Sequence, residues 1–141
     1  MSRVNIQEVQ PEAYKALFGV EKYMSTSSIE ANIQEFVRLR ASVINGCSFC
    51  KSMHSEALAK LGESEERVAA IADWQSSKLF SAKERAALAA ADEITNISVS
   101  GLSDEAYLQL SQHFNDEEIA QLIVLCGLIN LWNRMAISMA A

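Results

Sequence analysis

The sequence contains little of what non-helical folds require. Proline occurs once and glycine five times, and aromatic residues make up 7% of the 141 positions. Collagen-like, low-complexity and turn-rich all-β proteins depend on these residues, so their scarcity disfavours all three classes. Half of the residues are hydrophobic, which is too large a share for a disordered chain. A helical domain is therefore the expected class, and a chain of this length can bury a real core.

Positive charge and long hydrophobic runs are also scarce. Twelve Lys and Arg residues against eighteen Asp and Glu residues give a net charge of −6 and a pI near 4.9. A general nucleic-acid-binding protein needs a basic surface, so this balance argues against that function. The longest apolar stretch, residues 119–132, is interrupted by polar residues and is shorter than the ~20 residues that span a bilayer. No secretory signal is evident at the N-terminus. We expect a cytoplasmic protein without nucleic-acid or membrane partners.

Capping signals mark the expected helices. Three pairs have capping-box spacing: Ser27 with Glu30, Ser81 with Glu84, and Asn115 with Glu118. Ser64 and Ser103 are further N-cap candidates, because each precedes two acidic residues that suit a helix start. Apolar residues recur between these marks at helical spacing, and no segment shows the alternation of a strand. We predict one all-α domain, a bundle of about six to seven helices over residues 11–141, after an extended arm at 1–10. The predicted helices cover residues 11–19, 28–44, 48–61, 65–74, 82–96, 104–113 and 116–139.

The last of these helices is apolar around most of its circumference. A helix with this pattern is normally covered on all sides. Two explanations are open: residues 116–139 form the central helix of the bundle, or another subunit of a homo-oligomer covers one side of this helix.

Three cysteines are present, and two of them stand three residues apart. Cys47 and Cys50 form a C-x-x-C-x-x-x-H sequence with His54 at the start of a predicted helix. The free N–H groups and the dipole at a helix start stabilise a thiolate, which is the reactive form of cysteine. His54 lies four residues after Cys50, hence on the same helical face and within reach for proton transfer. Cysteines at this spacing can also close a disulfide.

Glu35 is the candidate fourth member of this group. If Asn45 and Gly46 reverse the chain between helices 28–44 and 48–61, Glu35 lies opposite about residue 56, half a helical turn from His54. A carboxylate in that place could accept a hydrogen bond from the imidazole, fix its tautomer and increase its basicity. The spacing permits this contact.

Other interpretations of the same residues are possible. Two thiolates and an imidazole could hold zinc, with Glu35 or a water as fourth ligand. Cys47 and Cys50 could instead be small buried residues without chemistry. Structural roles are expected for several further residues: Cys126 as a buried inert thiol, Trp74, Trp132 and the methionines as core filling, Asn133 and Arg134 as buried polar contacts between subunits, and Glu63, Glu65 and Glu66 as a solvated helix start.

Glu35 and residues 40–54 resemble the AhpD-like alkylhydroperoxidases within the wider carboxymuconolactone decarboxylase family. The motif of these proteins is a Glu separated by eleven residues from C-x-x-C-x-x-x-H, and Glu35 has that spacing. Residues 130–136, with the sequence Asn-Leu-Trp-Asn-Arg-Met-Ala, are similar to a segment on the last long helix of the family. The resemblance covers residues 12–139, which is most of the chain.

The resemblance implies an all-α fold, peroxidase chemistry at the cysteine pair, and trimers or hexamers. By position, Cys50 is the peroxidatic thiol, Cys47 the resolving and disulfide-exchange thiol, and Glu35 with His54 the proton relay. Phe49 stands where the lipoamide-linked branch has a second histidine, and the decarboxylase branch lacks the cysteine pair. We therefore expect a cofactor-independent, metal-free peroxidase that reduces a small-molecule peroxide and is regenerated by an external dithiol. A redox sensor or disulfide-exchange adaptor using the same cysteines is the second hypothesis.

Overall fold

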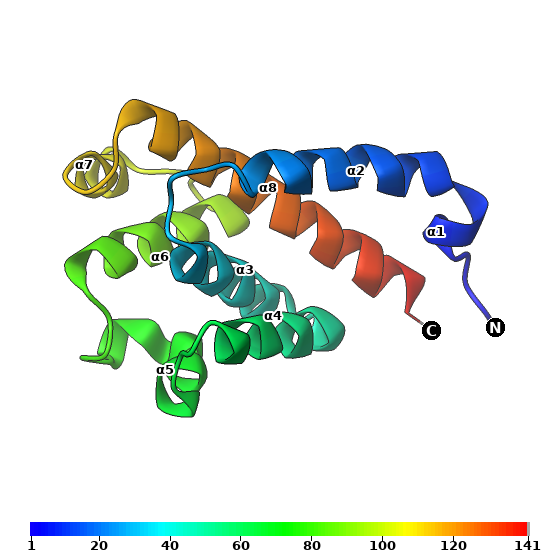
Figure 1. Ribbon diagram of the computed structural model, residues 1–141, viewed down its shortest axis with the longest axis horizontal. Helices are drawn as coiled ribbons and strands as arrows, with labels where there is room; N and C mark the ends of the chain where they lie inside the picture. The colour runs from blue at the N-terminus through cyan, green and yellow to red at the C-terminus, as the bar shows by residue number, and fades with distance from the viewer. Residues whose placement is uncertain (141) are drawn as a thin grey trace.

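The computed structural model describes residues 1–140 and contains only helices and loops in that range (Figure 1). The all-α prediction is thereby confirmed. In chain order the elements are α1 (Ile6–Val9), α2 (Pro11–Met24), α3 (Ala31–Asn45), α4 (Ser48–Lys60), α5 (Glu65–Ala70), the 3₁₀ helix η1 (Ile71–Ser76), α6 (Ala82–Thr95), α7 (Asp104–Ser111) and α8 (Asp116–Met139).

Helix α3 is the centre of the bundle, where it packs against α4, α6 and α8. One of its sides contributes Ile33 and Val37 to a core shared with α6, α7 and α8. Another side contributes Phe36 and Leu39 to a second core, formed with α4, η1 and α6. Because α3 is buried on both sides, polar groups on this helix are held on a rigid support.

Local capping chemistry explains most of the helix starts. Ser81 and Asn115 form complete capping boxes at α6 and α8, as predicted. Ser64 and Ser103 cap α5 and α7 through their hydroxyl oxygens. The capping box predicted at Ser27 is wrong. Helix α3 begins at Ala31, and the Ser27 hydroxyl instead donates a hydrogen bond to Gln121 of α8 at 2.6 Å.

Three further boundaries differ from the prediction. The segment 1–10 contains the one-turn helix α1, which Asn5 caps, and is not extended throughout. Helix α2 continues past residue 19 to Met24, whose side chain is buried in the first core. The helix predicted over 65–74 ends at Ala70 and continues as η1, where Asp73 has a non-helical backbone with φ −136° and ψ 55°.

Helix α8 has the predicted bounds but is not the central helix. It packs against α3 and α6 on one side, while Ile123, Val124, Leu131 and Ile137 are exposed on another. By length and composition α8 could cross a membrane, a criterion that a core helix of a soluble bundle also meets. Coverage of this exposed apolar side by another subunit, the second explanation for its pattern, stays a prediction.

Asn133 of α8 is fully buried within one subunit. Its side-chain amide donates a hydrogen bond to Ser42 at 3.1 Å and accepts one from Asn45 at 3.0 Å. The prediction that Asn133 makes polar contacts between subunits is therefore wrong, because these partners belong to α3 of the same chain. The companion residue Arg134 is exposed and donates to Asn130.

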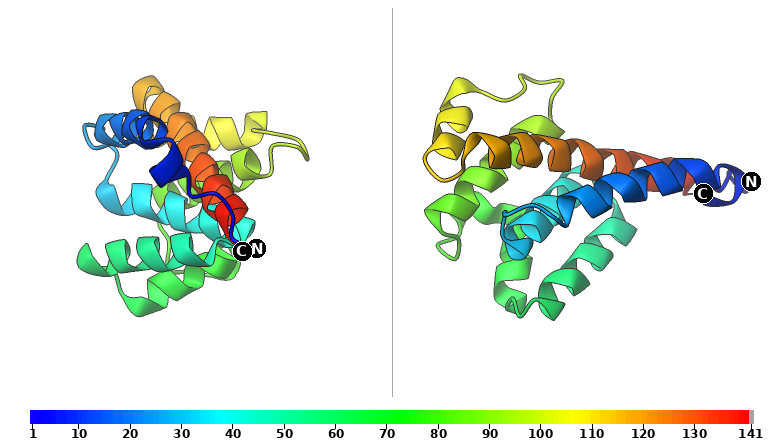
Figure 2. Two further views of the ribbon diagram at one scale, coloured as in Figure 1. Left: turned by 90° about the vertical axis from the view of Figure 1, so that its right-hand side faces the viewer. Right: turned by 45° about the horizontal axis from the view of Figure 1, so that its top comes forward.

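The segment 1–24 lies alongside the C-terminal half of α8, and both views of Figure 2 place the two chain ends together. Arg3 donates a hydrogen bond to the backbone oxygen of Ser138 at 3.0 Å, and the Ile6 N–H contacts the Met139 sulfur at 3.2 Å. Helix α2 contacts α8 but makes fewer contacts with the rest of the bundle than α3 does. It therefore forms a cover on one side of the molecule.

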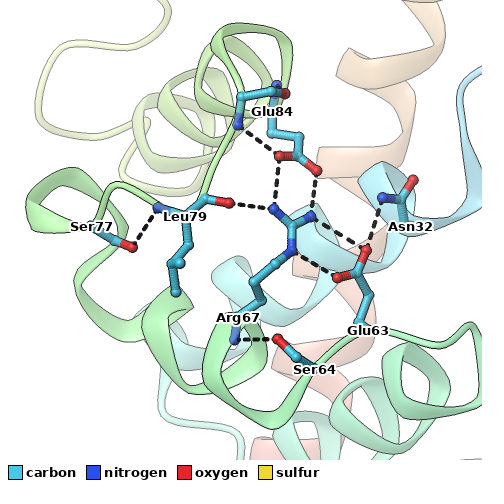
Figure 3. A network of polar contacts seen from close by, with 8 residues as sticks. Asn32, Glu63, Ser64, Arg67, Ser77, Leu79 and Glu84 are labelled. Atoms are coloured by element: carbon cyan, nitrogen blue, oxygen red, sulfur yellow. Dashed lines mark hydrogen bonds and ion pairs between the residues drawn. The ribbon is translucent and has the colours of Figure 1, made fainter.

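A partly buried ion-pair network, drawn in Figure 3, fastens α5 to α6 and to the loop before α5. Arg67 donates to both carboxylate oxygens of Glu63, to both carboxylate oxygens of Glu84 and to the Leu79 backbone oxygen. These contacts satisfy all five of its N–H groups. The guanidinium also lies 5.0 Å from the ring centre of Phe36 in the second core. We call Arg67, Glu63 and Glu84 the Arg67 clamp.

The clamp changes the titration of its carboxyl groups. Hydrogen bonds from Arg67 lower the pKa of Glu63 despite its partial burial. For Glu84 burial acts to raise the pKa, but the Arg67 hydrogen bonds and the Ser81 N–H outweigh it, so the net direction is downward. Glu63 was predicted to belong to a solvated helix start, and that prediction is wrong. Glu65 and Glu66 are exposed, as expected.

Candidate active site

A tight turn between α3 and α4 presents the cysteine motif. Gly46 ends α3 in the left-handed conformation with φ 71°, which a residue with a side chain adopts only at a cost. Cys47 follows as the N-cap of α4, and its sulfur accepts a hydrogen bond from the Cys50 N–H at 3.3 Å. The cysteine pair therefore lies at a helix start, where free N–H groups favour negative charge on sulfur.

Cys47 and Cys50 are joined by a disulfide, with their Cα atoms 5.3 Å apart. Both residues are buried, at 3% exposure each. Their surroundings differ, because Cys50 lines the main cavity of the protein and Cys47 does not. The two sulfurs are thus distinguished by access to the cavity.

Glu35 and His54 meet across the α3–α4 hairpin, as the spacing permitted. Glu35 Oε2 lies 2.8 Å from His54 Nδ1, and the histidine is buried at 7% exposure. A carboxylate can only accept a hydrogen bond, so Nδ1 is the donor in this contact, and in the neutral imidazole Nε2 is then the nitrogen that keeps a free lone pair. The contact with Glu35 thus fixes the orientation of the His54 ring.

A cavity of about 960 Å³ lies beside these groups, between the cover formed by residues 3–21 and helices α3, α4 and α8. This volume is at the upper end of the range for pockets that bind small organic molecules. Glu35, Cys50 and His54 all line it, so the Cys50 sulfur, the imidazole and the carboxylate open onto one space. Its apolar lining consists of Val4, Tyr14, Phe18, Phe49, Met53, Ala57, Trp132, Ala136, Met139 and Ala140.

Among the cavity residues that had not been predicted as part of the site, Glu21, Arg38 and Trp132 are joined by hydrogen bonds. Glu21 Oε1 accepts hydrogen bonds from Arg38 Nη1 at 2.7 Å and from Trp132 Nε1 at 2.9 Å. Trp132 packs against the first core, as expected, and it also lines the cavity with Tyr14, their ring centres 5.3 Å apart. The sequence holds one signal for Arg38, which stands three residues after Glu35 and therefore on the same face of α3.

Other predicted roles are resolved by burial. Trp74 and Met24 lie in the hydrophobic cores, as expected, whereas Met53 is exposed beside the cavity. Cys126 is buried in α8, and this burial raises the pKa of its thiol to about 12, so it stays protonated and unreactive. Within residues 1–140 no three His, Cys, Asp or Glu side chains are grouped as a metal site would require.

The fold and the site define a class: an all-α protein with a cysteine pair able to form a disulfide beside a carboxylate–histidine pair in an apolar cavity. Residues 11–93 match the Carboxymuconolactone decarboxylase family, and the chain belongs to that family.

Known proteins resemble most of the chain. The uncharacterized protein YdfG of Bacillus subtilis (strain 168) is 36% identical over 137 residues, which are 97% of this chain and 93% of that protein. A crystal structure from Agrobacterium tumefaciens, of a protein of unknown function named as a candidate antioxidant defence protein AhpD, has a TM-score of 0.94. It is 38% identical, and the match covers 99% of this chain and 95% of that one.

The debrominase Bmp8 shares the fold, with a TM-score of 0.82 at 24% identity. The match covers 94% of this chain and 72% of that one. The fold is therefore compatible with more than one kind of chemistry, and the reaction has to be argued from the site itself.

Proposed function

We propose that this protein is a thiol-dependent peroxidase of the alkylhydroperoxidase type, which reduces organic peroxides through Cys50 and Cys47. One observation carries the proposal: Cys50, His54 and Glu35 line the same cavity, with Glu35 holding Nδ1 of His54 at 2.8 Å. A nucleophile, a base and the group that orients the base are thus assembled where a small molecule can reach them.

The cycle starts from the dithiol. His54 Nε2 takes the proton of the Cys50 thiol, and the thiolate attacks the terminal oxygen of the peroxide. An S–O bond forms, the O–O bond breaks, and the alcohol leaves with the proton returned by His54. Cys47 then attacks the Cys50 sulfenic acid, so that the disulfide forms and water leaves. An external dithiol reduces the disulfide, is itself oxidised, and closes the cycle.

The cavity lining supports an organic substrate. Phe49, Met53 and Trp132 present apolar surface beside Cys50, which favours an alkyl or aryl peroxide over a small hydrophilic one. We place this activity in the cytoplasm, where a reducing environment keeps cysteines available as thiols.

We also propose that the protein is a homo-oligomer, a trimer or a hexamer. Ile123, Val124, Leu131 and Ile137 leave an exposed apolar side on α8, which association of subunits would cover. Light scattering at micromolar concentration tests this proposal. A mass of three or six subunits is expected, and a mass of 15.5 kDa would contradict it.

An anaerobic titration of the reduced protein with cumene hydroperoxide tests the proposed reaction. Two thiols should be lost per equivalent of peroxide, and a regenerating dithiol should sustain turnover. Cys50→Ser should abolish peroxide consumption, whereas Cys47→Ser should trap the Cys50 sulfenic acid as a dimedone adduct. Oxidation in the titration without turnover would instead favour the redox sensor or disulfide-exchange adaptor. An adduct on Cys47 in the Cys50→Ser protein would reverse the two roles.

A further inference from the structure

The residues behind the Glu35–His54 pair form a continuous polar chain across four helices. Trp132 of α8 donates to Glu21 of α2, Glu21 accepts from Arg38 of α3, and Arg38 faces Glu35, which holds His54 of α4. All of these residues line the cavity.

Arg38 is the incompletely paired member of this chain. It is buried at 6% exposure, and its Nη1 donates to Glu21 at 2.7 Å. Its buried Nε has no hydrogen-bond partner in the described structure and lies 3.6 Å from Glu35 Oε1, slightly beyond hydrogen-bond distance. Leaving a buried cationic donor unpaired is costly, so Arg38 retains an attraction for Glu35 that the present geometry does not satisfy.

Glu35 therefore stands between two competing donors. Its Oε2 is bound to His54 Nδ1 at 2.8 Å, and its Oε1 faces Arg38 Nε at 3.6 Å. A movement of a few tenths of an ångström would complete the bond to Arg38. The strength of the hydrogen bond between Glu35 and His54 thus depends on the strength of the ion pair between Glu21 and Arg38.

We propose that Arg38 and Glu21 are positioning residues that control proton transfer at Cys50 by sharing Glu35 between Arg38 and His54. When His54 takes the Cys50 proton, the imidazolium draws Glu35 toward itself. When His54 gives that proton to the leaving alcohol, Glu35 relaxes toward Arg38 Nε. No covalent bond changes in this movement of Glu35. Its role in turnover rests on the proposed peroxidase function.

The charges around the cavity fix the direction of the expected effects. The charged groups that face Cys50 and His54 are Glu21 from α2, Glu35 and Arg38 from α3, and Arg3 from the N-terminal segment, whereas α8 contributes no charged side chain to the lining. Removing the Arg38 cation favours protonated His54 and disfavours the Cys50 thiolate. Removing the Glu21 anion has the opposite effect on both groups.

The first test measures the rate at which iodoacetamide alkylates Cys50 in the fully reduced protein between pH 5 and 10. It uses a Cys47→Ser background, in which buried Cys126 does not compete. We expect Arg38→Met to move the half-maximal pH upward by about one unit, and Glu21→Gln to move it downward by a similar amount. Arg38→Lys, which keeps the charge, should stay within about 0.3 units of the parent. The matched control for Glu21→Gln is Glu12→Gln, which removes the same charge at an exposed position of α2.

The second test follows the His54 ring nitrogens by ¹⁵N NMR in a His113→Gln background, where His54 is the only histidine. The pH at which His54 is half protonated should move upward in Arg38→Met and downward in Glu21→Gln. Opposite shifts support the proposal, whereas shifts of one sign or none overturn it. If Arg38→Met does not fold, the pair Glu21→Gln and Arg38→Lys replaces it. A downward shift in Glu21→Gln with Arg38→Lys within about 0.3 units of the parent then supports the proposal, and no shift in Glu21→Gln overturns it. Neither test uses peroxide, so a failure of the peroxidase proposal would be seen separately in the turnover assay.

Discussion

Arg67, which is partly buried, and Arg38, which is buried, use the same guanidinium chemistry in opposite ways. Arg67 has an acceptor for every N–H group and lies over the aromatic rings of Phe36 and Phe80. Arg38, which is more deeply buried, has one good hydrogen bond and an unpaired Nε beside a cavity. Because every N–H group of Arg67 is hydrogen-bonded, the Arg67 clamp has one low-energy arrangement. Arg38 has an unpaired Nε, so a small movement of Glu35 gives its network a second arrangement. The comparison separates a part of the protein built for stability from a part available for chemistry.

The largest expected effect falls on the cavity side. His54→Gln removes the base, and peroxide consumption should fall by about 10²–10⁴-fold, the usual contribution of a positioned acid–base group. The free energy of unfolding should change by about 1 kcal/mol, because one hydrogen bond to Glu35 is altered. Stopped-flow kinetics and urea unfolding measure the two effects. Activity equal to the wild type at neutral pH would remove His54 from the mechanism.

Arg67→Met should show the reverse pattern. It leaves Glu63 and Glu84 without their cation and should lower the free energy of unfolding by about 3 kcal/mol. Activity per folded molecule should stay unchanged, because no member of the clamp lines the cavity. The same urea and kinetic measurements apply. A large loss of activity in the folded variant would erase the proposed division between the two networks.

The clamp also predicts how stability depends on pH. The pKa values of Glu63 and Glu84 are lowered by folding, so their contribution is complete above the unfolded value near 4.5 and is lost as pH falls through the folded values. The stability difference between the wild type and Arg67→Met should be constant from about pH 5.5 to 7 and shrink below about pH 4. Urea unfolding at pH 7, 5.5 and 3.5 measures it. A difference that persists at pH 3.5 would mean that the clamp stabilises the fold through packing and not through charge.

The smallest effect is expected at a buried group that belongs to neither network. Cys126→Ala removes one sulfur from the core and should cost about 1 kcal/mol of stability without affecting turnover. Thermal unfolding and the peroxide assay provide the measurements. Loss of activity at unchanged stability would give Cys126 a role that its buried position does not suggest.

Features encoded locally could be predicted from the sequence. The capping boxes at Ser81 and Asn115 are complete within four residues, and both were located correctly. The Glu35–His54 contact also followed from local information, because one tight turn at Gly46 brings the two helices together. Ser27 misled the prediction, since its hydroxyl is taken by Gln121, a partner 94 residues away along the chain.

The cavity could not be predicted, because it is assembled from distant segments. Trp132 and Glu21 are 111 residues apart, and no periodicity or motif relates them. Arg38 was overlooked for a related reason. A charged residue on the buried helix α3 acquires its meaning only when α2 and α4 supply the carboxylate and the histidine around it. The exposed side of α8 was ambiguous in the sequence because an interface and a core have the same apolar composition.

The meeting of the two chain ends has a practical consequence for protein engineering. Arg3 bonds to Ser138, and residues from both ends line the mouth of the cavity. A tag fused at either end would therefore start close to the cavity that Cys50 lines, so kinetic assays are best made on protein from which tags have been cleaved. The same proximity invites a circular permutant: a short linker could join the ends, with new termini in the exposed loop at residues 96–100. Such a variant would tie down the cover of the cavity and leave the cysteine turn intact.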